Sequence, residues 1–199
     1  SLYIGLLTTA ATGAVGLFIL ATFMMNDITL FLAGIFGIIA MLSSTFAALY
    51  YTGTGGKPVR QTAECSKGGP AINIITGLSF GLQSPILPII AVVASIALAY
   101  AITGGSPYAL IAANISTDII IAFIMASDTF GPITDNAHGI AEMSGISEQA
   151  GKTLESLDAV GNTMKAATKA YAMASGTYTS FTIFATFFAT ASIVNLAVN

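Results

Sequence analysis

Residues 108–143 read YALIAANISTDIIIAFIMASDTFGPITDNAHGIAEM, a long apolar run that ends in a polar, acidic stretch. The run is long enough to cross a membrane, because about 20 apolar residues span the hydrocarbon core. Asp128, Asp135 and Glu142 recur every seven residues, which would place them on one face of a continuous helix. The Gly-Pro pair at 131–132 argues against a straight helix, because proline lacks a backbone donor and clashes with the preceding turn. Acids at the end of an apolar span are costly and indicate a function.

The composition is typical of an integral membrane protein. Of the 199 residues, 55% are hydrophobic and only 8% are charged, whereas soluble domains carry about 25% charged residues. The single cysteine, Cys65, excludes an internal disulfide and a multi-cysteine metal site. The formal net charge of -3 is small and spread out, so we expect no nucleic-acid partner. The chain begins and ends inside apolar runs, and we therefore expect it to be a piece of a longer polypeptide.

The apolar segments predict an all-α integral membrane fold with five transmembrane helices in membrane lipid. We expect a single transmembrane domain over residues 1–199, with spans at about 2–25, 28–51, 69–102, 108–133 and 152–198 and loops at about 52–68 and 134–151. Gln83, Pro85 and Pro88 predict a kink or a break near the middle of the third span.

The basic residues predict the orientation of the chain in the membrane. Three lie in loop 52–68 (Lys57, Arg60 and Lys67), Lys152 lies in the connection between the fourth and fifth spans, and Lys165 and Lys169 lie early in the fifth span. By the positive-inside rule, both loops, including the acidic loop 134–151, face the cytoplasm.

A second polar cluster lies early in the fifth span. Four of its residues recur at intervals of four, three and four, which places them on one face of a helix. They are Asp158, Asn162, Lys165 and Lys169. Such a stripe entering a membrane must face a water-filled cavity or polar partners. Because loop 134–151 joins the fourth and fifth spans, we expect the stripe and the acidic stretch to share one cavity.

The residue types in these clusters favour a hard cation together with an anion. Hard oxygen ligands come from three carboxylates and two amides, at Asp128, Asp135, Asp158, Asn136 and Asn162. Such ligands suit Mg²⁺ bound together with substrate phosphates, and nearby lysines suit phosphate. The single histidine, His138, has no cysteine partner for zinc, and the chain has no Walker-type phosphate loop. These residues alone predict a membrane-embedded site for Mg²⁺ and an anion.

Two motifs in these clusters resemble those of the membrane-bound pyrophosphatases, which are ion pumps driven by hydrolysis of inorganic pyrophosphate. Residues 131–143, GPITDNAHGIAEM, resemble the family signature GP(I/V)(S/T)DNAGGIAEM, and residues 157–163, LDAVGNT, resemble the signature LDAxGNTT. The segments KPVR at 57–60 and GPAINII at 69–75 are also similar to the family. The resemblance covers nearly the whole chain. Three residues depart from the pattern without removing a proposed ligand, namely His138, Met164 and Ala170.

The resemblance implies a larger bundle of about sixteen transmembrane helices, of which the five spans would be the eighth to twelfth. It implies Mg-dependent hydrolysis of inorganic pyrophosphate coupled to outward translocation of H⁺ or Na⁺, in a homodimer. The remaining helices of the same polypeptide would carry the family's other acidic and lysine-containing motifs. We therefore expect these 199 residues alone to be inactive.

The resemblance also implies a magnesium site. Asp135 and Asn162 match residues that help to hold the magnesium ions of the Mg–pyrophosphate complex. Asp128 matches an acid upstream of the Gly-Pro pair, and its role is either support of this site or direct contact with metal or water.

The lysine stripe resembles that of potassium-independent members. Lys165 and Thr168 match their pattern, in which a tethered ammonium stands in for K⁺ beside the anionic substrate. Lys169 matches a family lysine, and either contacts the substrate or forms an ion pair with Asp158 or another acid.

An alternative reading stays open at this point. Asp118, Asp128, Asp135 and the lysines could form an ion path in a non-enzymatic transporter or channel subunit. Asp118 stands alone in a span, and we expect it to be paired or to face a cavity. We expect His138 to be a surface or loop substitution, and Glu142 to be a solvated or structural acid at the membrane edge.

Overall fold

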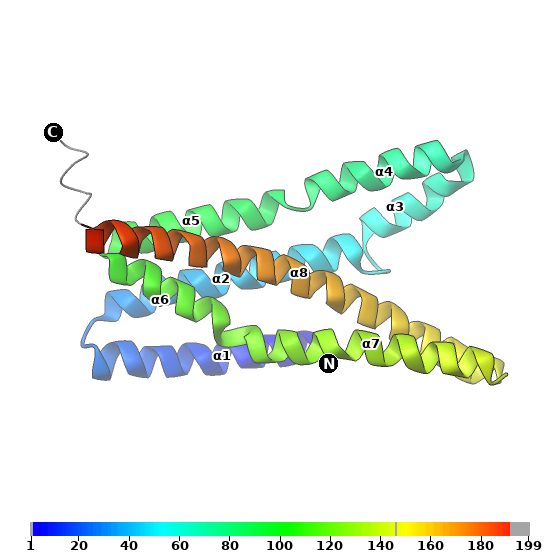
Figure 1. Cartoon of the computed structure of the whole chain (residues 1–199), viewed down its shortest axis with the longest axis horizontal. Coiled ribbons are helices and arrows are strands. Elements are labelled where there is room, and N and C mark those ends of the chain that lie inside the picture. The colour runs from blue at the N-terminus through cyan, green and yellow to red at the C-terminus, as the bar shows by residue number, and fades with distance from the viewer. Residues whose placement is uncertain (1, 146, 192–199) are drawn as a thin grey trace. The chain divides into compact units, whose positions relative to one another are not determined.

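The computed structural model describes residues 2–145 and 147–191, and this part of the chain confirms an all-α fold. Figure 1 labels the α-helices; the full order, with the π-helix η1 and the 3-10 helices η2 and η3, is α1 (Leu2–Ile19), η1 (Leu20–Met24), α2 (Ile28–Thr52), α3 (Lys57–Cys65), η2 (Ser66–Gly68), α4 (Pro70–Gln83), α5 (Ile86–Ile102), α6 (Pro107–Thr117), η3 (Asp118–Ile120), α7 (Ile121–Met143) and α8 (Glu148–Ala191). Residues 192–198 of the fifth predicted span lie outside the described residues.

Within the described residues, four helical segments are long and apolar enough to cross a membrane. They are Leu2–Met24, Ile28–Gly68, Pro70–Ile102 and Pro107–Met143, and they correspond to the first four predicted spans, to within one residue at Met25 and Gly69. Helix α8 is one helix of 44 residues, or about 66 Å at 1.5 Å per residue. It does not meet the same test of apolar composition, so the fifth crossing stays a prediction.

Prolines mark several helix ends where the sequence predicts them. The third span breaks between α4 and α5 at residues 84–85, as its Gln and Pro residues predict. Pro70 and Pro107 stand in the first turns of α4 and α6, where a missing backbone donor does no harm.

The connections between the spans are more helical than the sequence predicts. Helix α7 continues through Pro132 to Met143 rather than ending at residue 133, so that the acidic loop shrinks to a turn before α8. Membrane helices tolerate an interior proline when their surroundings satisfy the freed backbone groups. The connection 52–68 likewise contains α3 and η2.

The chain forms two compact units, which are described separately. Unit 1 comprises Ser1–Leu42, Ile89–Ile121 and Ala172–Asn199, and unit 2 comprises Ser43–Pro88 and Ala122–Tyr171.

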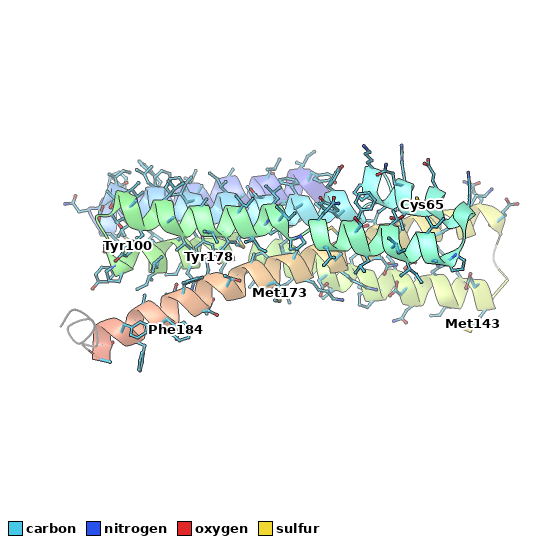
Figure 2. All side chains as sticks on the ribbon, turned by 90° about the horizontal axis from the view of Figure 1, so that it is seen from above. Cys65, Tyr100, Met143, Met173, Tyr178 and Phe184 are labelled. Atoms are coloured by element: carbon cyan, nitrogen blue, oxygen red, sulfur yellow. The ribbon has the colours of Figure 1, made fainter. Side chains whose placement is uncertain are left out.

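Small residues let helices of unit 1 approach closely. Gly37 of α2 lies against the backbone of α6, where a Cβ atom would be 3.1 Å from the carbonyl carbon of Ala113. Such glycine contacts are the usual means of close packing between membrane helices. Tyr178 of α8, labelled in Figure 2, is fully buried and donates a hydrogen bond to Ser95 Oγ on α5.

Polar side chains also join α6, η3 and α8 within unit 1. Ser175 Oγ donates to Asp118 Oδ1 over 3.4 Å and lies 3.3 Å from Thr117 Oγ1. Thr179 Oγ1 donates to Asn114 Oδ1 over 3.2 Å. Asp118 is therefore paired, which is one of the two outcomes that the sequence predicts for an acid inside a span.

Unit 2 contains two pairs of adjacent helices. Helix α3 packs against α4, and Cys65 lies at the end of α3 where the chain turns (Figure 2). Helix α7 and the first part of α8 run side by side, joined by the turn that follows Met143 (Figure 1). This second pair carries the candidate site.

Candidate polar site on helices α7 and α8

The predicted stripe on α8 forms a chain of hydrogen bonds along one helix face. Asn162 Nδ2 donates to Asp158 Oδ2 over 3.3 Å. Lys165 Nζ donates to Asn162 Oδ1 over 3.2 Å. Intervals of three and four residues place side chains on the same face of a helix, so the periodicity predicts this part of the site.

The stripe meets α7 through one ion pair. Lys165 Nζ donates to Asp135 Oδ2, and the two side chains are 28% and 43% exposed. The ammonium therefore bridges the carboxylate of Asp135 and the amide oxygen of Asn162. The two residues that resemble magnesium ligands thus come together from different helices, with a fixed positive charge between them.

A second acid stands beside this pair. The carboxyl groups of Asp135 and Asp158 interact directly with each other. Oδ1 of Asp158 is buried and accepts no hydrogen bond from any described residue. Two facing carboxylates favour a shared proton or a bound cation, because like charges destabilise each other.

These oxygens fit part of a magnesium site. Carboxylate and amide oxygens are the ligands that Mg²⁺ takes from proteins, usually with several waters and substrate phosphates completing the octahedron. In the described part of the chain, no group of three or more His, Cys, Asp or Glu side chains is arranged to hold a metal ion. Asp135, Asp158 and Asn162 therefore offer a partial ligand set, which suits an ion that also binds phosphate.

His138 lies nearer the site than the sequence predicts. Because α7 continues past Pro132, His138 belongs to a helix rather than a loop, and its side chain is only 25% exposed. Its Nε2 is 3.7 Å from Oε1 of Glu142, one turn further along. The imidazole also interacts electrostatically with Asp135 and Asp158. Its spacing of three residues from Asp135 would have predicted this, had the helix been expected to continue.

Three other predicted residues lie apart from the cluster. Asp128 and Lys169 form no hydrogen bond or ion pair with any described residue. An ion pair between Lys169 and Asp158 is not formed, because eleven residues of helix separate them by about 16 Å. Thr168 is buried, and its hydroxyl donates to the carbonyl of Met164 in its own helix.

Two glycines that were not among the predicted site residues, Gly131 and Gly161, bring α7 and α8 together. A Cβ atom on Gly161 would lie 2.8 Å from Gly131 Cα and 2.6 Å from Thr134 Oγ1. The helices therefore cross with nearly direct backbone contact. This close crossing allows a side chain on α8 to reach Asp135 on α7.

Fold and site together define an all-helical membrane protein with a charged site shared by two of its helices. The family model described as inorganic H⁺ pyrophosphatase matches residues 1–199, and the chain belongs to this family.

Curated relatives agree with this assignment. The chain is 35% identical over 93% of its length to the K⁺-insensitive pyrophosphate-energized proton pump of Methanosarcina mazei. It is 39% identical over 81% of its length to the K⁺-insensitive pyrophosphate-energized proton pump 2 of Moorella thermoacetica. It is 40% identical, again over 81% of its length, to the K⁺-insensitive pyrophosphate-energized proton pump of Caldanaerobacter subterraneus. The chain spans only 28%, 25% and 24% of these relatives, about a quarter of their length.

Proposed function

We propose that this chain supplies part of the substrate and cation site of a potassium-insensitive membrane pump that couples pyrophosphate hydrolysis to outward proton translocation. The observation that carries the proposal is the position of the Lys165 ammonium, which contacts both Asp135 and Asn162. The names of the relatives support it, because each describes a K⁺-insensitive pyrophosphate-energized proton pump. Na⁺ as the pumped ion is the alternative.

Asp135 and Asn162 would hold magnesium with their side-chain oxygens, and the buried Oδ1 of Asp158 offers one more oxygen nearby. When bound, magnesium neutralises pyrophosphate and stabilises the charge that develops during hydrolysis. The chain's own part is to position these oxygens on two packed helices. Asp128, on the same face of α7 two turns earlier, would support the site.

Lys165 would supply a fixed monovalent cation. A tethered ammonium next to Asp135 can occupy the place that K⁺ would take beside the anionic substrate. The packing of α7 against α8 keeps this ammonium in position. Lys169, which has no acidic partner among the described residues, is available to the substrate phosphates. Thr168 supports this arrangement from within α8 through its bond to Met164.

The proposal extends to the protein as a whole. The basic residues of the two connections would place the α7–α8 turn on the cytoplasmic side. Further helices of the same polypeptide would supply the other substrate ligands, and the pump would be a homodimer.

Alanine substitutions in the full-length protein test the proposal. In Asp135→Ala and Asn162→Ala, we expect Mg-dependent pyrophosphate hydrolysis to fall on the order of 100-fold or more, because direct ligands of the transition state are lost. The matched control is Glu148→Gln, which removes the charge of an exposed acid of α8 that pairs with Lys152. Wild-type hydrolysis in both alanine variants would overturn the site. Ion flux without any pyrophosphate hydrolysis in the native protein would favour the non-enzymatic transporter.

A further inference from the structure

We propose that Gly131 is a positioning residue for the Lys165 ammonium, because its missing side chain leaves the space along which the Lys165 side chain reaches Asp135. This inference rests on the proposed role of Lys165 as the internal monovalent cation. In this inference, a glycine on α7 determines where the ammonium of a lysine on α8 lies.

The contacts around Gly131 point to this lysine specifically. A Cβ atom built on Gly131 would lie 3.0 Å from Cγ and 3.1 Å from Cδ of Lys165, and closer still to its Cε. The three nearest atoms thus all belong to the aliphatic part of one side chain. Gly131 itself is buried, so the lysine stem lies across the backbone of α7 rather than in solvent.

Backbone conformation does not explain the glycine. Gly131 lies inside α7 and its φ angle is not positive, so an alanine could adopt the same backbone conformation. Glycine inside a helix is less favourable than alanine by about 1 kcal/mol. A glycine at this position is therefore explained by the room that a side chain would take up, and the Lys165 side chain occupies that room.

Gly161 has a different part in the same crossing. Its missing side chain faces the backbone of Gly131 and the hydroxyl of Thr134, so it sets the distance between the helices. Gly131 faces the side chain that passes through the crossing. A methyl group at Gly131 would leave the helices packed and push the flexible lysine aside, which moves the ammonium away from Asp135 and Asn162.

The direct test is Gly131→Ala in the full-length protein, measured as pyrophosphate hydrolysis with and without K⁺. We expect potassium-free activity to fall on the order of 10- to 100-fold, because a displacement near 1 Å of a positioned group has this effect. Added K⁺ should restore part of the activity, although Lys165 is intact. The matched control is Gly139→Ala on the same helix, where a Cβ atom would meet nothing within 4 Å, and it should stay indifferent to K⁺.

A second variant keeps the inference testable if Gly131→Ala is inactive under all conditions. Gly131→Ala combined with Lys165→Ala removes the side chain with which the new methyl collides. The double variant should show the same K⁺-stimulated activity as Lys165→Ala alone. A double variant that stays inactive would overturn the inference, because the methyl group would then be harmful without the lysine.

The same series separates the two proposals. If Lys165→Ala becomes K⁺-dependent while Gly131→Ala keeps wild-type, K⁺-indifferent activity, the lysine role stands and the Gly131 inference is overturned. If Lys165→Ala is itself fully active without K⁺, the cation role of Lys165 fails and the inference fails with it.

Discussion

Helix α8 uses polar side chains differently in the two units. In unit 2 its residues Asp158, Asn162 and Lys165 form a charged, partly exposed chain that ends on Asp135 of another helix. In unit 1 the buried hydroxyl of Tyr178 bonds to a single neutral partner, the hydroxyl of Ser95. One helix thus carries a cluster of charges in one region and a paired hydroxyl in another.

The difference teaches which polar groups are for packing and which are for chemistry. A hydrogen bond between membrane helices contributes about 0.6 kcal/mol on average, and a pair of hydroxyls satisfies itself. Charges near the membrane are costly and are kept where they bind or move something. Changes to the Tyr178–Ser95 pair of unit 1 should therefore alter stability, whereas changes to the charged cluster of unit 2 should alter the response to ions.

The largest effect beyond the direct ligands is expected for Asp158→Ala. Its buried Oδ1 has no hydrogen-bond donor in the described part of the chain, and its carboxyl group interacts with that of Asp135. Loss of this side chain should therefore weaken magnesium binding about 10- to 100-fold. Titration of pyrophosphate hydrolysis with Mg²⁺ measures this as a higher half-saturating concentration. An unchanged magnesium dependence would remove Asp158 from the site.

Two glycine variants sharpen the comparison between the units. Gly161→Ala in unit 2 and Gly37→Ala in unit 1 both place a methyl group against another helix, and each should destabilise the protein by about 1–3 kcal/mol. Thermal unfolding in detergent measures the loss. Only Gly161→Ala should also create a response of the remaining activity to K⁺. The same K⁺ response in Gly37→Ala would show that the effect is general loosening.

Tyr178→Phe should have a smaller effect. It removes the hydroxyl that bonds to Ser95 but keeps the buried ring, so we expect a loss near 0.6 kcal/mol in stability. Hydrolysis at saturating substrate should stay within about threefold of the wild type, because a change of 1.4 kcal/mol corresponds to tenfold and about 0.6 kcal/mol to roughly threefold. A tenfold loss of activity in a protein that remains folded would contradict the assignment of this bond to packing.

The smallest effect is expected for Lys152→Gln. Lys152 and Glu148 pair on the surface of α8 with side chains 67% and 85% exposed, and such pairs contribute little. Stability and K⁺ response should both match the wild type. A K⁺-dependent Lys152→Gln enzyme would mean that total positive charge, rather than the position of Lys165, sets the cation requirement.

Sequence periodicity was sufficient for the face of α8, because residues three and four apart share a helix face whatever surrounds them. Proline predicted the break near Pro85 correctly. The same proline argument was wrong at Pro132, where α7 continues, because whether a proline ends a membrane helix depends on its neighbours as well as on the residue. The positions of His138 and Asp135 on a continuous α7 follow from that one difference.

The contact between Gly131 and Lys165 was beyond sequence reasoning for another reason. A pattern within one helix does not say which glycine of a second helix faces it. Thr168 shows the same limit, since its similarity to potassium-independent members does not reveal that its hydroxyl bonds within its own helix.

The central claim is that the Lys165 ammonium, held on Asp135 and Asn162, takes the place of K⁺. The most direct test is K⁺ titration of pyrophosphate hydrolysis by full-length Lys165→Ala. We predict low activity without K⁺ and a saturable rise as K⁺ is added, with Thr168 left unchanged because it bonds only within α8. Full activity of Lys165→Ala in the absence of K⁺ would contradict the account.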